Sequence, residues 1–150
     1  MLKLRTILFA EDNLSDIELT LDALNDYKLA NNVVVVRDGV EAMEYLHYEG
    51  KFKERKKGNP AFILLDIKMP RMDGLEVLQA IRDDEKLKLI PVVILSSSRE
   101  EQDLIKSYQL GVNAYVVKPV DFKAFIEAVK QLGIFWAVIN EIPPEIKLME

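Results

Sequence analysis

Short apolar runs alternate with amphipathic stretches five times along the chain. Each run is almost entirely apolar, whereas a strand with one solvent-facing side would alternate apolar and polar residues. Continuous apolar runs are typical of strands that are covered on both faces of a parallel sheet. We therefore predict five strands, over Thr6–Ala10, Val33–Val36, Phe62–Leu65, Val92–Leu95 and Ala114–Val117.

The stretches between the runs carry apolar residues at helical spacing and predict five helices. Ser15 to Glu18 has the sequence of a capping box, Asp121 can cap the fifth helix, and Gly111 suits a left-handed position at the end of the fourth. The helices begin near Ser15, Gly39, Gly74, Glu100 and Asp121. Their predicted core-facing residues are Ile17, Leu21, Leu24, Ala42, Met43, Leu46, Leu75, Leu78, Ile81, Leu104, Tyr108, Phe122, Phe125, Ile126, Val129 and Leu132.

Strand and helix alternation predicts an α/β fold, a doubly wound five-stranded parallel sheet with helices on both faces and right-handed crossovers. We expect one domain over residues 1–150, with a core over about residues 5–132. In such sheets ligands bind beyond the carboxyl ends of the strands.

Two segments fall outside the repeat. Residues 48–60 form a polar insertion with a local excess of three positive charges. We interpret it as a solvated loop, with a docking patch for an acidic partner as the alternative. Residues 133–150 form an apolar extension in which Trp136 and Ile139 continue the helical spacing. Trp136 either packs on its own domain or lies, with Phe135, in a homodimer seam or a partner contact.

The amino-acid composition excludes several classes of function. The 150 residues are 49% hydrophobic and 30% charged, as in an ordinary globular domain, and the net charge of -5 gives no support for nucleic-acid binding. The absence of cysteine excludes disulfides, thiol nucleophiles and cysteine zinc sites, and His47 alone cannot build a multi-histidine metal site. No apolar run approaches the ~20 residues of a membrane span or resembles a signal peptide, so we expect a cytoplasmic protein without membrane contact.

Polar residues follow four of the predicted strands. Glu11 and Asp12 follow the first, Asp66 the third, Ser96 the fourth and Lys118 the fifth. Because the carboxyl ends of parallel strands meet at one edge, these side chains should converge. Clustered carboxylates repel each other and favour a divalent cation, and a set of oxygen donors suits Mg²⁺, with Mn²⁺ as a substitute. Metal, lysine and hydroxyl together could neutralise a phosphoryl group on an aspartate.

Four motifs in order resemble the receiver domain of two-component response regulators: AEDN, LLDIKMPRMDG, VVILSSS and AYVVKP, at residues 10–13, 64–74, 92–98 and 114–119. The resemblance covers essentially residues 5–132 and implies the strand order 2-1-3-4-5. It implies that Asp66 accepts a phosphoryl group from a phosphohistidine of a sensor histidine kinase or a phosphotransfer protein. It also implies that Asp12, Asp66 and the backbone carbonyl of Lys68 bind Mg²⁺, with Glu11 helping largely through water.

The resemblance assigns further roles near the phosphoryl group. Ser96, Ser97 and Lys118 would bind it or switch with it, and Tyr115 would turn inward after phosphorylation. The bond between Lys118 and Pro119 would be cis, a geometry essentially confined to proline. Glu11 stands where aspartate is more common, and Ser96 where threonine is; both keep the needed chemistry.

The implied function is a stand-alone response regulator that signals by protein contact and is not a turnover enzyme. The 18 residues after Leu132 are too few for a DNA-binding or enzymatic module. The layout is similar to single-domain regulators that serve bacterial phytochromes, so a phytochrome-type kinase is one candidate for the upstream partner.

Three other functions are alternatives to this one. A flavodoxin-like electron carrier shares the fold, but Glu11-Asp12-Asn13 would repel a flavin phosphate. A haloacid-dehalogenase-type phosphatase expects a second aspartate two residues after the nucleophile, where this chain has Lys68. A phosphorylation-independent binding module on the same fold is the remaining alternative.

Overall fold

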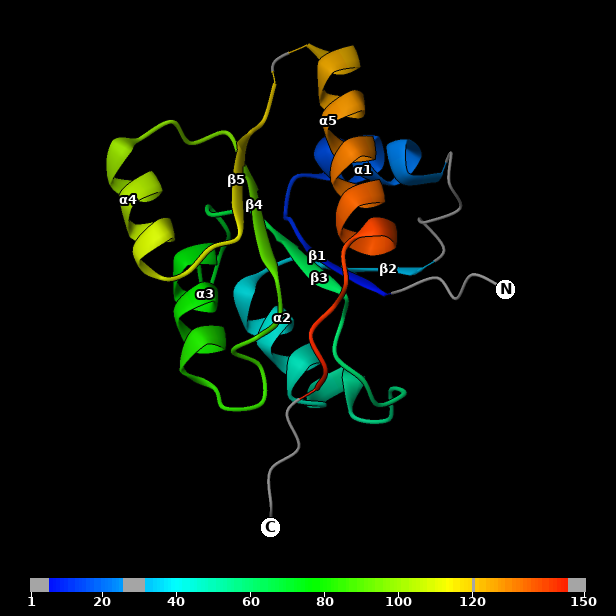
Figure 1. The fold of residues 1–150 in the computed structure, drawn as a ribbon, viewed down its shortest axis with the longest axis vertical. Coiled ribbons are helices and arrows are strands. Elements are labelled where there is room, and N and C mark those ends of the chain that lie inside the picture. Colours follow the sequence, from blue (N-terminus) through cyan, green and yellow to red (C-terminus); the bar gives the residue numbers. More distant parts are fainter. Residues whose placement is uncertain (1–5, 26–31, 120, 146–150) are drawn as a thin grey trace.

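Five parallel strands form one sheet in the order β2-β1-β3-β4-β5 (Figure 1). The computed structural model of the chain describes residues 6–25, 32–119 and 121–145. Residue 5, the predicted start of the core, and residues 146–150 of the extension lie outside these ranges. The strands are β1 (Ile7–Ala10), β2 (Val33–Val36), β3 (Phe62–Leu65), β4 (Val92–Ser96) and β5 (Ala114–Val117). The predicted sheet and its order are confirmed; β1 starts one residue later than predicted and β4 ends one residue later.

Helices cover both faces of the sheet. Helices α1 and α5 lie side by side on one face, and α2 and α3 lie on the other, with α4 beyond α3 (Figure 1). The helices are α1 (Leu14–Asn25), α2 (Gly39–Leu46), α3 (Gly74–Asp83), α4 (Glu101–Gln109) and α5 (Phe122–Ile134). A 3₁₀ helix, η2 (Gly50–Phe52), follows α2, and a π-helix, η3 (Phe135–Ile139), follows α5. The described residues contain no helix that is both long and apolar enough to cross a bilayer.

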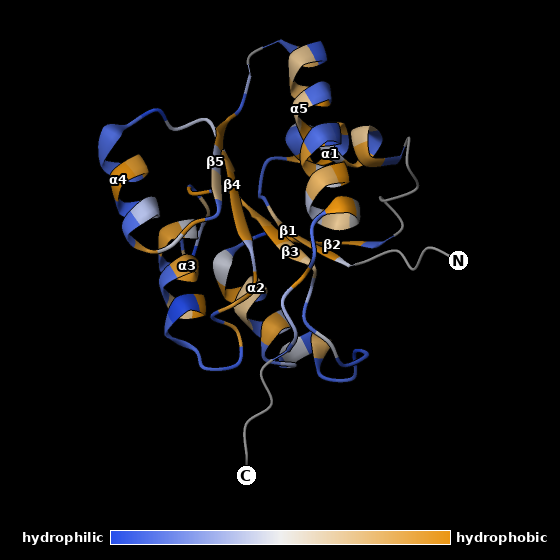
Figure 2. Cartoon of the chain, in the orientation of Figure 1, coloured by the Kyte–Doolittle hydropathy of each residue, from blue (hydrophilic) through white to orange (hydrophobic). Residues whose placement is uncertain are grey.

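The apolar core is divided in two by the sheet. Leu8 and Ala10 of β1 belong to the cluster under α2 and α3, whereas Ile7 and Phe9 belong to the cluster under α1 and α5. Alternate residues therefore enter opposite clusters, and both sets are apolar because both faces are covered. Figure 2 shows the strands as hydrophobic and the helices as two-sided.

The start of α1 differs from the prediction. The backbone N–H of Asp16 donates to Oδ1 of Asn13 at 3.0 Å, so Asn13 caps the helix, which begins at Leu14. The capping box predicted at Ser15 is therefore wrong, because Ser15 already lies inside the first turn. A capping box does occur in α3, between Asp73 and Glu76.

Two predicted core residues face solvent instead. Tyr108 of α4 is 57% exposed and Phe122 of α5 is 68% exposed. In α4 the fully buried residue is Ser107, whose hydroxyl donates to the carbonyl of Asp103 at 2.7 Å and so needs no partner outside the helix. Phe122 is the first residue of α5, where the helix extends beyond the end of the sheet (Figure 1).

The insertion over residues 48–60 folds around Arg55. Its guanidinium carbon lies 3.9 Å from the ring centres of both Tyr45 and Tyr48, and its N–H groups donate to the carbonyls of Tyr45, Lys56 and Gly58. One basic residue of the run is thus structural rather than solvated. Exposed side chains of the run include Lys53, Lys56 and Lys57.

The C-terminal extension continues α5, as predicted. The helix passes Gly133 and ends as the π-helix η3. The Trp136 ring lies 6.4 Å from the Phe62 ring, centre to centre, and packs against the core under α1 and α5. Trp136 therefore packs on its own domain, while Phe135 and Ile139 beside it are 48% and 62% exposed.

Candidate functional site

Three predicted carboxylates meet at the carboxyl end of the sheet. Glu11 and Asp12 follow β1, Asp66 follows β3, and these two strands are neighbours. The ladder continues one residue past each strand, because Glu11 N–H donates to the carbonyl of Val36 at 3.0 Å and Asp66 N–H donates to that of Ala10 at 3.1 Å. One carboxylate oxygen from each residue lies within 4.8 Å of the others. Such a set of oxygens fits a hard divalent cation.

Burial gives this cluster unusual electrostatics. Glu11 and Asp66 are buried, and Asp12 is half-buried. Burial raises the pKa of Glu11 to about 7; the hydrogen bond from Lys118 opposes this rise, and the negative charge of Asp66 adds to it. A divalent cation among these oxygens would favour their charged forms.

Lys118 is the cation of the site. Its Nζ lies 2.6 Å from Oε1 of Glu11, 2.8 Å from Oδ2 of Asp16 and 3.5 Å from Oδ2 of Asp66, and its side chain is 9% exposed. Burial alone would lower the pKa of Lys118, but the hydrogen bonds to Asp16 and Glu11 outweigh it and raise the pKa above its ordinary value. The ammonium group therefore stays charged inside the protein.

The bond between Lys118 and Pro119 differs from the expected cis geometry. The described residues contain no cis peptide bond, so the bond from Lys118 to Pro119 is trans. Proline favours trans by only about 0.5–1 kcal/mol, so the surrounding structure selects the isomer, and a Lys-Pro sequence does not determine it.

The serine that ends β4 and the two that follow it differ in their surroundings. Ser96 and Ser98 are buried, whereas Ser97 is exposed. Ser98 N–H donates to Oγ of Ser96 at 3.2 Å, and Ser98 Oγ donates to Oδ2 of Asp103 in α4 at 2.5 Å. The hydroxyl of Tyr115 donates to the carbonyl of Ser98 at 3.0 Å, and burial raises the pKa of Tyr115. Ser98, which was not predicted as a site residue, connects Ser96, Tyr115 and α4.

The loop from β3 to α3 approaches the cluster closely. A Cβ atom on Gly74 would overlap the carbonyl oxygen of Asp66, so only glycine fits where α3 begins. In the same loop Arg71 has φ of 64° and binds Oδ2 of Asp38 at 2.8 Å through both Nε and Nη2. The side chain of Lys68 points outward and is exposed.

Two features were missed at the sequence level. Asp16 was interpreted only as part of a capping box, although it completes the carboxylates around Lys118. The pair of Asp38 and Arg71 was missed because 33 residues separate them. The sequence signal for Asp16 is its position four residues after Asp12, in the first turn of the helix that follows the acidic loop.

Comparison with known proteins gives consistent matches. The response regulator receiver domain family matches residues 7–130. Response regulator Rcp1 of Synechocystis sp. is 35% identical over 139 residues, 93% of each chain, and its Mn²⁺-bound structure superposes with a TM-score of 0.86 over 93% of this chain and 99% of Rcp1.

Two further solved structures are similar. The phosphorylated cyanobacterial phytochrome response regulator RcpA is 41% identical, with a TM-score of 0.86 over 93% of this chain and 99% of RcpA. The bacteriophytochrome response regulator RtBRR is 60% identical, with a TM-score of 0.74 over 95% of this chain and 86% of RtBRR. With motif order, sheet order and these matches in agreement, the chain belongs to the response regulator receiver domain family.

Proposed function

We propose that the domain is a phosphorylation switch in which Asp66 accepts a phosphoryl group from a phosphohistidine of a sensor histidine kinase or a phosphotransfer protein. The observation that carries this proposal is the cluster of Glu11, Asp12 and Asp66, whose oxygens lie within 4.8 Å, with Lys118 beside it. An acceptor carboxylate, metal-binding oxygens and a buried cation are the parts that phosphoryl transfer needs.

Each side chain has a defined task in this proposal. A carboxylate oxygen of Asp66 attacks phosphorus, and the bond from phosphorus to the donor imidazole nitrogen breaks, leaving its electron pair on the nitrogen. Glu11, Asp12, Asp66 and the carbonyl of Lys68 would hold Mg²⁺, which neutralises charge on the phosphoryl oxygens. Lys118 and Ser96 donate to those oxygens, with exposed Ser97 at the rim.

The output of the switch runs through Tyr115 and α4. Ser96 Oγ accepts from Ser98 N–H, and Ser98 in turn accepts from Tyr115 and donates to Asp103 of α4. A Ser96 hydroxyl that turns to a phosphoryl group gives up this contact with Ser98. The β4–α4 loop and the Tyr115 ring then settle into a different arrangement, which changes the surface that partners meet.

The relatives support both the metal and the upstream partner. Rcp1 has been solved with Mn²⁺ and RcpA in its phosphorylated form. RcpA is a phytochrome response regulator and RtBRR a bacteriophytochrome response regulator. We infer that this chain takes Mg²⁺, with Mn²⁺ as a substitute, and that a phytochrome-type histidine kinase is its donor.

Phosphorylation can be tested directly by mass. We expect incubation with Mg²⁺ and acetyl phosphate to add one phosphoryl group to the intact protein, and Asp66→Ala to prevent it. Asp83→Ala, which removes an exposed carboxylate from α3, should still be phosphorylated. An unchanged mass in the folded wild type would instead favour the phosphorylation-independent binding module.

We also propose that the exposed side of the extension mediates self-association. Phe135 and Ile139 are exposed apolar residues beside the partly buried Trp136, and adjoining exposed apolar residues can form the contiguous patch that marks an interface. Light scattering should give twice the mass of one chain for the wild type and one chain mass for Phe135→Ser. Phe122→Ser removes an even more exposed ring at the other end of α5 and should leave the dimer intact. A monomeric wild type would refute the proposal.

A further inference from the structure

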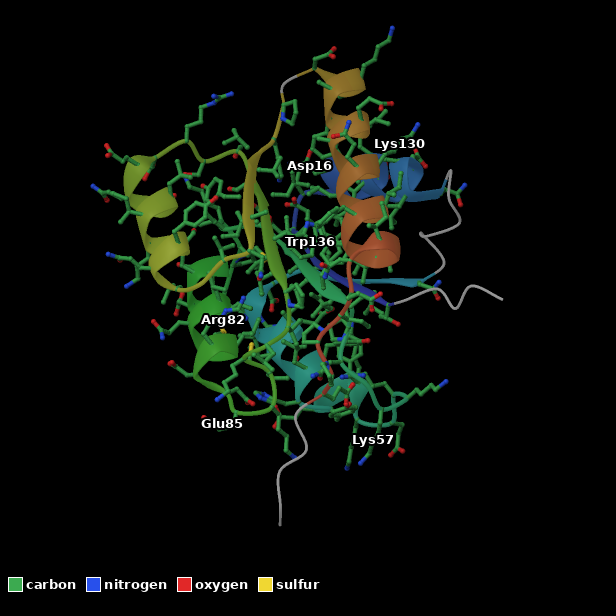
Figure 3. The ribbon with its side chains drawn as sticks, in the orientation of Figure 1. Asp16, Lys57, Arg82, Glu85, Lys130 and Trp136 are labelled. Atoms are coloured by element: carbon green, nitrogen blue, oxygen red, sulfur yellow. The ribbon has the colours of Figure 1, made fainter. Side chains whose placement is uncertain are left out.

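Asp16 is a fourth carboxylate beside the cluster, contributed by the first turn of α1 (Figure 3). Its side chain is 24% exposed, and its Oδ2 accepts from Lys118 Nζ at 2.8 Å. The backbone of Asp16 is fixed in turn, because its N–H donates to the capping Oδ1 of Asn13. The cap therefore presents this carboxylate to Lys118 in a set position.

The ammonium group of Lys118 lies at unequal distances from the three carboxylates around it. An ammonium group has three N–H donors. Two of them are used on Glu11 and Asp16, at 2.6 and 2.8 Å, while Asp66 lies 3.5 Å away. The cation is thus held nearer to the two outer carboxylates than to the proposed acceptor.

Glu11 and Asp16 differ in one respect that matters for this sharing. Glu11 is one of the three residues whose oxygens can hold a metal ion together, and Asp16 is not. A Glu11 carboxylate that is shared with a divalent cation attracts Lys118 less strongly. Asp16 keeps its full charge for Lys118 under the same conditions.

We propose that Asp16 is a positioning residue that holds Lys118 back from Asp66 and so opposes phosphorylation of Asp66. The proposal rests on the proposed function, since it assigns Asp16 a role in the same site. A phosphoryl group on Asp66 competes with Asp16 for the donors of Lys118. The strength of the hydrogen bond between Asp16 and Lys118 then sets how readily the phosphorylated state forms.

The test uses Mg²⁺ and beryllium fluoride, an analogue of the phosphoryl group, and measures the affinity by calorimetry. Asp16→Asn removes the charge and keeps the size of the side chain. We expect it to bind beryllium fluoride about three- to tenfold more tightly than the wild type, as exchange of one charge-assisted hydrogen bond implies. Asp16→Glu restores a carboxylate and should return the affinity to within about twofold of the wild type.

Two controls separate positioning from other effects. Asp22→Asn removes an exposed charge from the same helix without touching Lys118, so it reports the general effect of charge. Affinity for Mg²⁺ alone should not rise in Asp16→Asn, because one nearby negative charge is lost. Tighter beryllium fluoride binding without tighter Mg²⁺ binding is a combination that a purely structural role of Asp16 would not produce.

The outcomes are distinguishable. Equal or weaker binding of beryllium fluoride by Asp16→Asn, or an equal gain in Asp22→Asn, overturns the role of Asp16 while leaving the proposed function intact. A folded wild type that binds no beryllium fluoride overturns the proposed function itself. Asp16→Ala provides a second test of the same sign if Asn disturbs the first turn of α1.

Discussion

Lys118 and Arg55 lie at opposite ends of the sheet, and the groups that surround these two cations differ in kind. Lys118, at the carboxyl end, is surrounded by carboxylates and hydrogen-bonds to charged groups. Arg55, at the other end, lies between two tyrosine rings and hydrogen-bonds to neutral carbonyls. In Figure 3, Asp16, a partner of Lys118, lies in the upper half of the view, and Lys57, from the insertion that contains Arg55, lies near its lower edge.

This difference separates a site that can rearrange from one that is fixed. Around Lys118 several anions compete for the same three donors, so a new anion can redistribute them. The neutral carbonyls and rings around Arg55 offer no such competition, and the guanidinium fixes the shape of the insertion. The exchangeable partners of Lys118 therefore suit the proposed switch, whereas the fixed partners of Arg55 suit a structural role.

The largest effect should follow Gly74→Ala, at the carboxyl end. Its added Cβ would overlap the carbonyl of Asp66, so the backbone at the cluster must shift. We expect the free energy of unfolding to fall by about 3 kcal/mol, measured by urea denaturation. Gln79→Ala, exposed on the same helix, should change it by less than about 0.5 kcal/mol. A stable Gly74→Ala protein with unchanged Mg²⁺ affinity would contradict the close approach described here.

The next effect is on the pH dependence of stability, and its sign differs between the two ends. The pKa of Glu11 is raised to about 7 in the folded state, so folding favours the protonated carboxyl. Protonated Glu11 therefore stabilises the folded state at low pH, and this stabilisation is lost as pH rises from about 4.5 to 7. We expect the unfolding free energy, measured without metal, to fall by about 2 kcal/mol over that window. Glu11→Gln should flatten the profile there.

Asp84, at the amino end, gives the matched comparison. Burial alone would raise its pKa, but hydrogen bonds from His47 and from the backbone of Lys86 outweigh burial and lower it. Its contribution is therefore present above the ordinary pKa and is lost as pH falls below it. Asp84→Asn should leave the slope of unfolding free energy against pH, from pH 4.5 to 7, as it is in the wild type. A flattened slope in this variant would mean that the group titrating in this range lies at the amino end of the sheet and is not Glu11.

The smallest effect should come from Arg55→Ala. Loss of the two ring contacts and of the hydrogen bonds to Tyr45 and Gly58 should lower the unfolding free energy by about 1–2 kcal/mol. Arg55→Lys should not rescue it, because an ammonium group cannot stack flat or donate in a fork. Lys56→Ala, exposed next to it, is the control, and an equal loss there would show that Arg55 has no special role.

The sheet was predictable because both of its faces are covered, so residues such as Leu8 and Phe9 are apolar in spite of facing opposite clusters. Asp66 and Lys118 were predictable because parallel strands bring their carboxyl ends together. Asp16 was not, because local pattern suggested a cap at Ser15 while its partner lies 102 residues away. Arg55 was not, because a run of cations does not show which of them meets two aromatic rings.

The lone tryptophan has a practical consequence. Trp136 lies against Phe62 under α5, on the side of the sheet that α1 also covers. Because the chain has no other tryptophan, tryptophan fluorescence reports on one place, the contact between the C-terminal extension and the core. The fluorescence of Trp136 can therefore follow the release of the C-terminal extension from the core in real time without any attached dye.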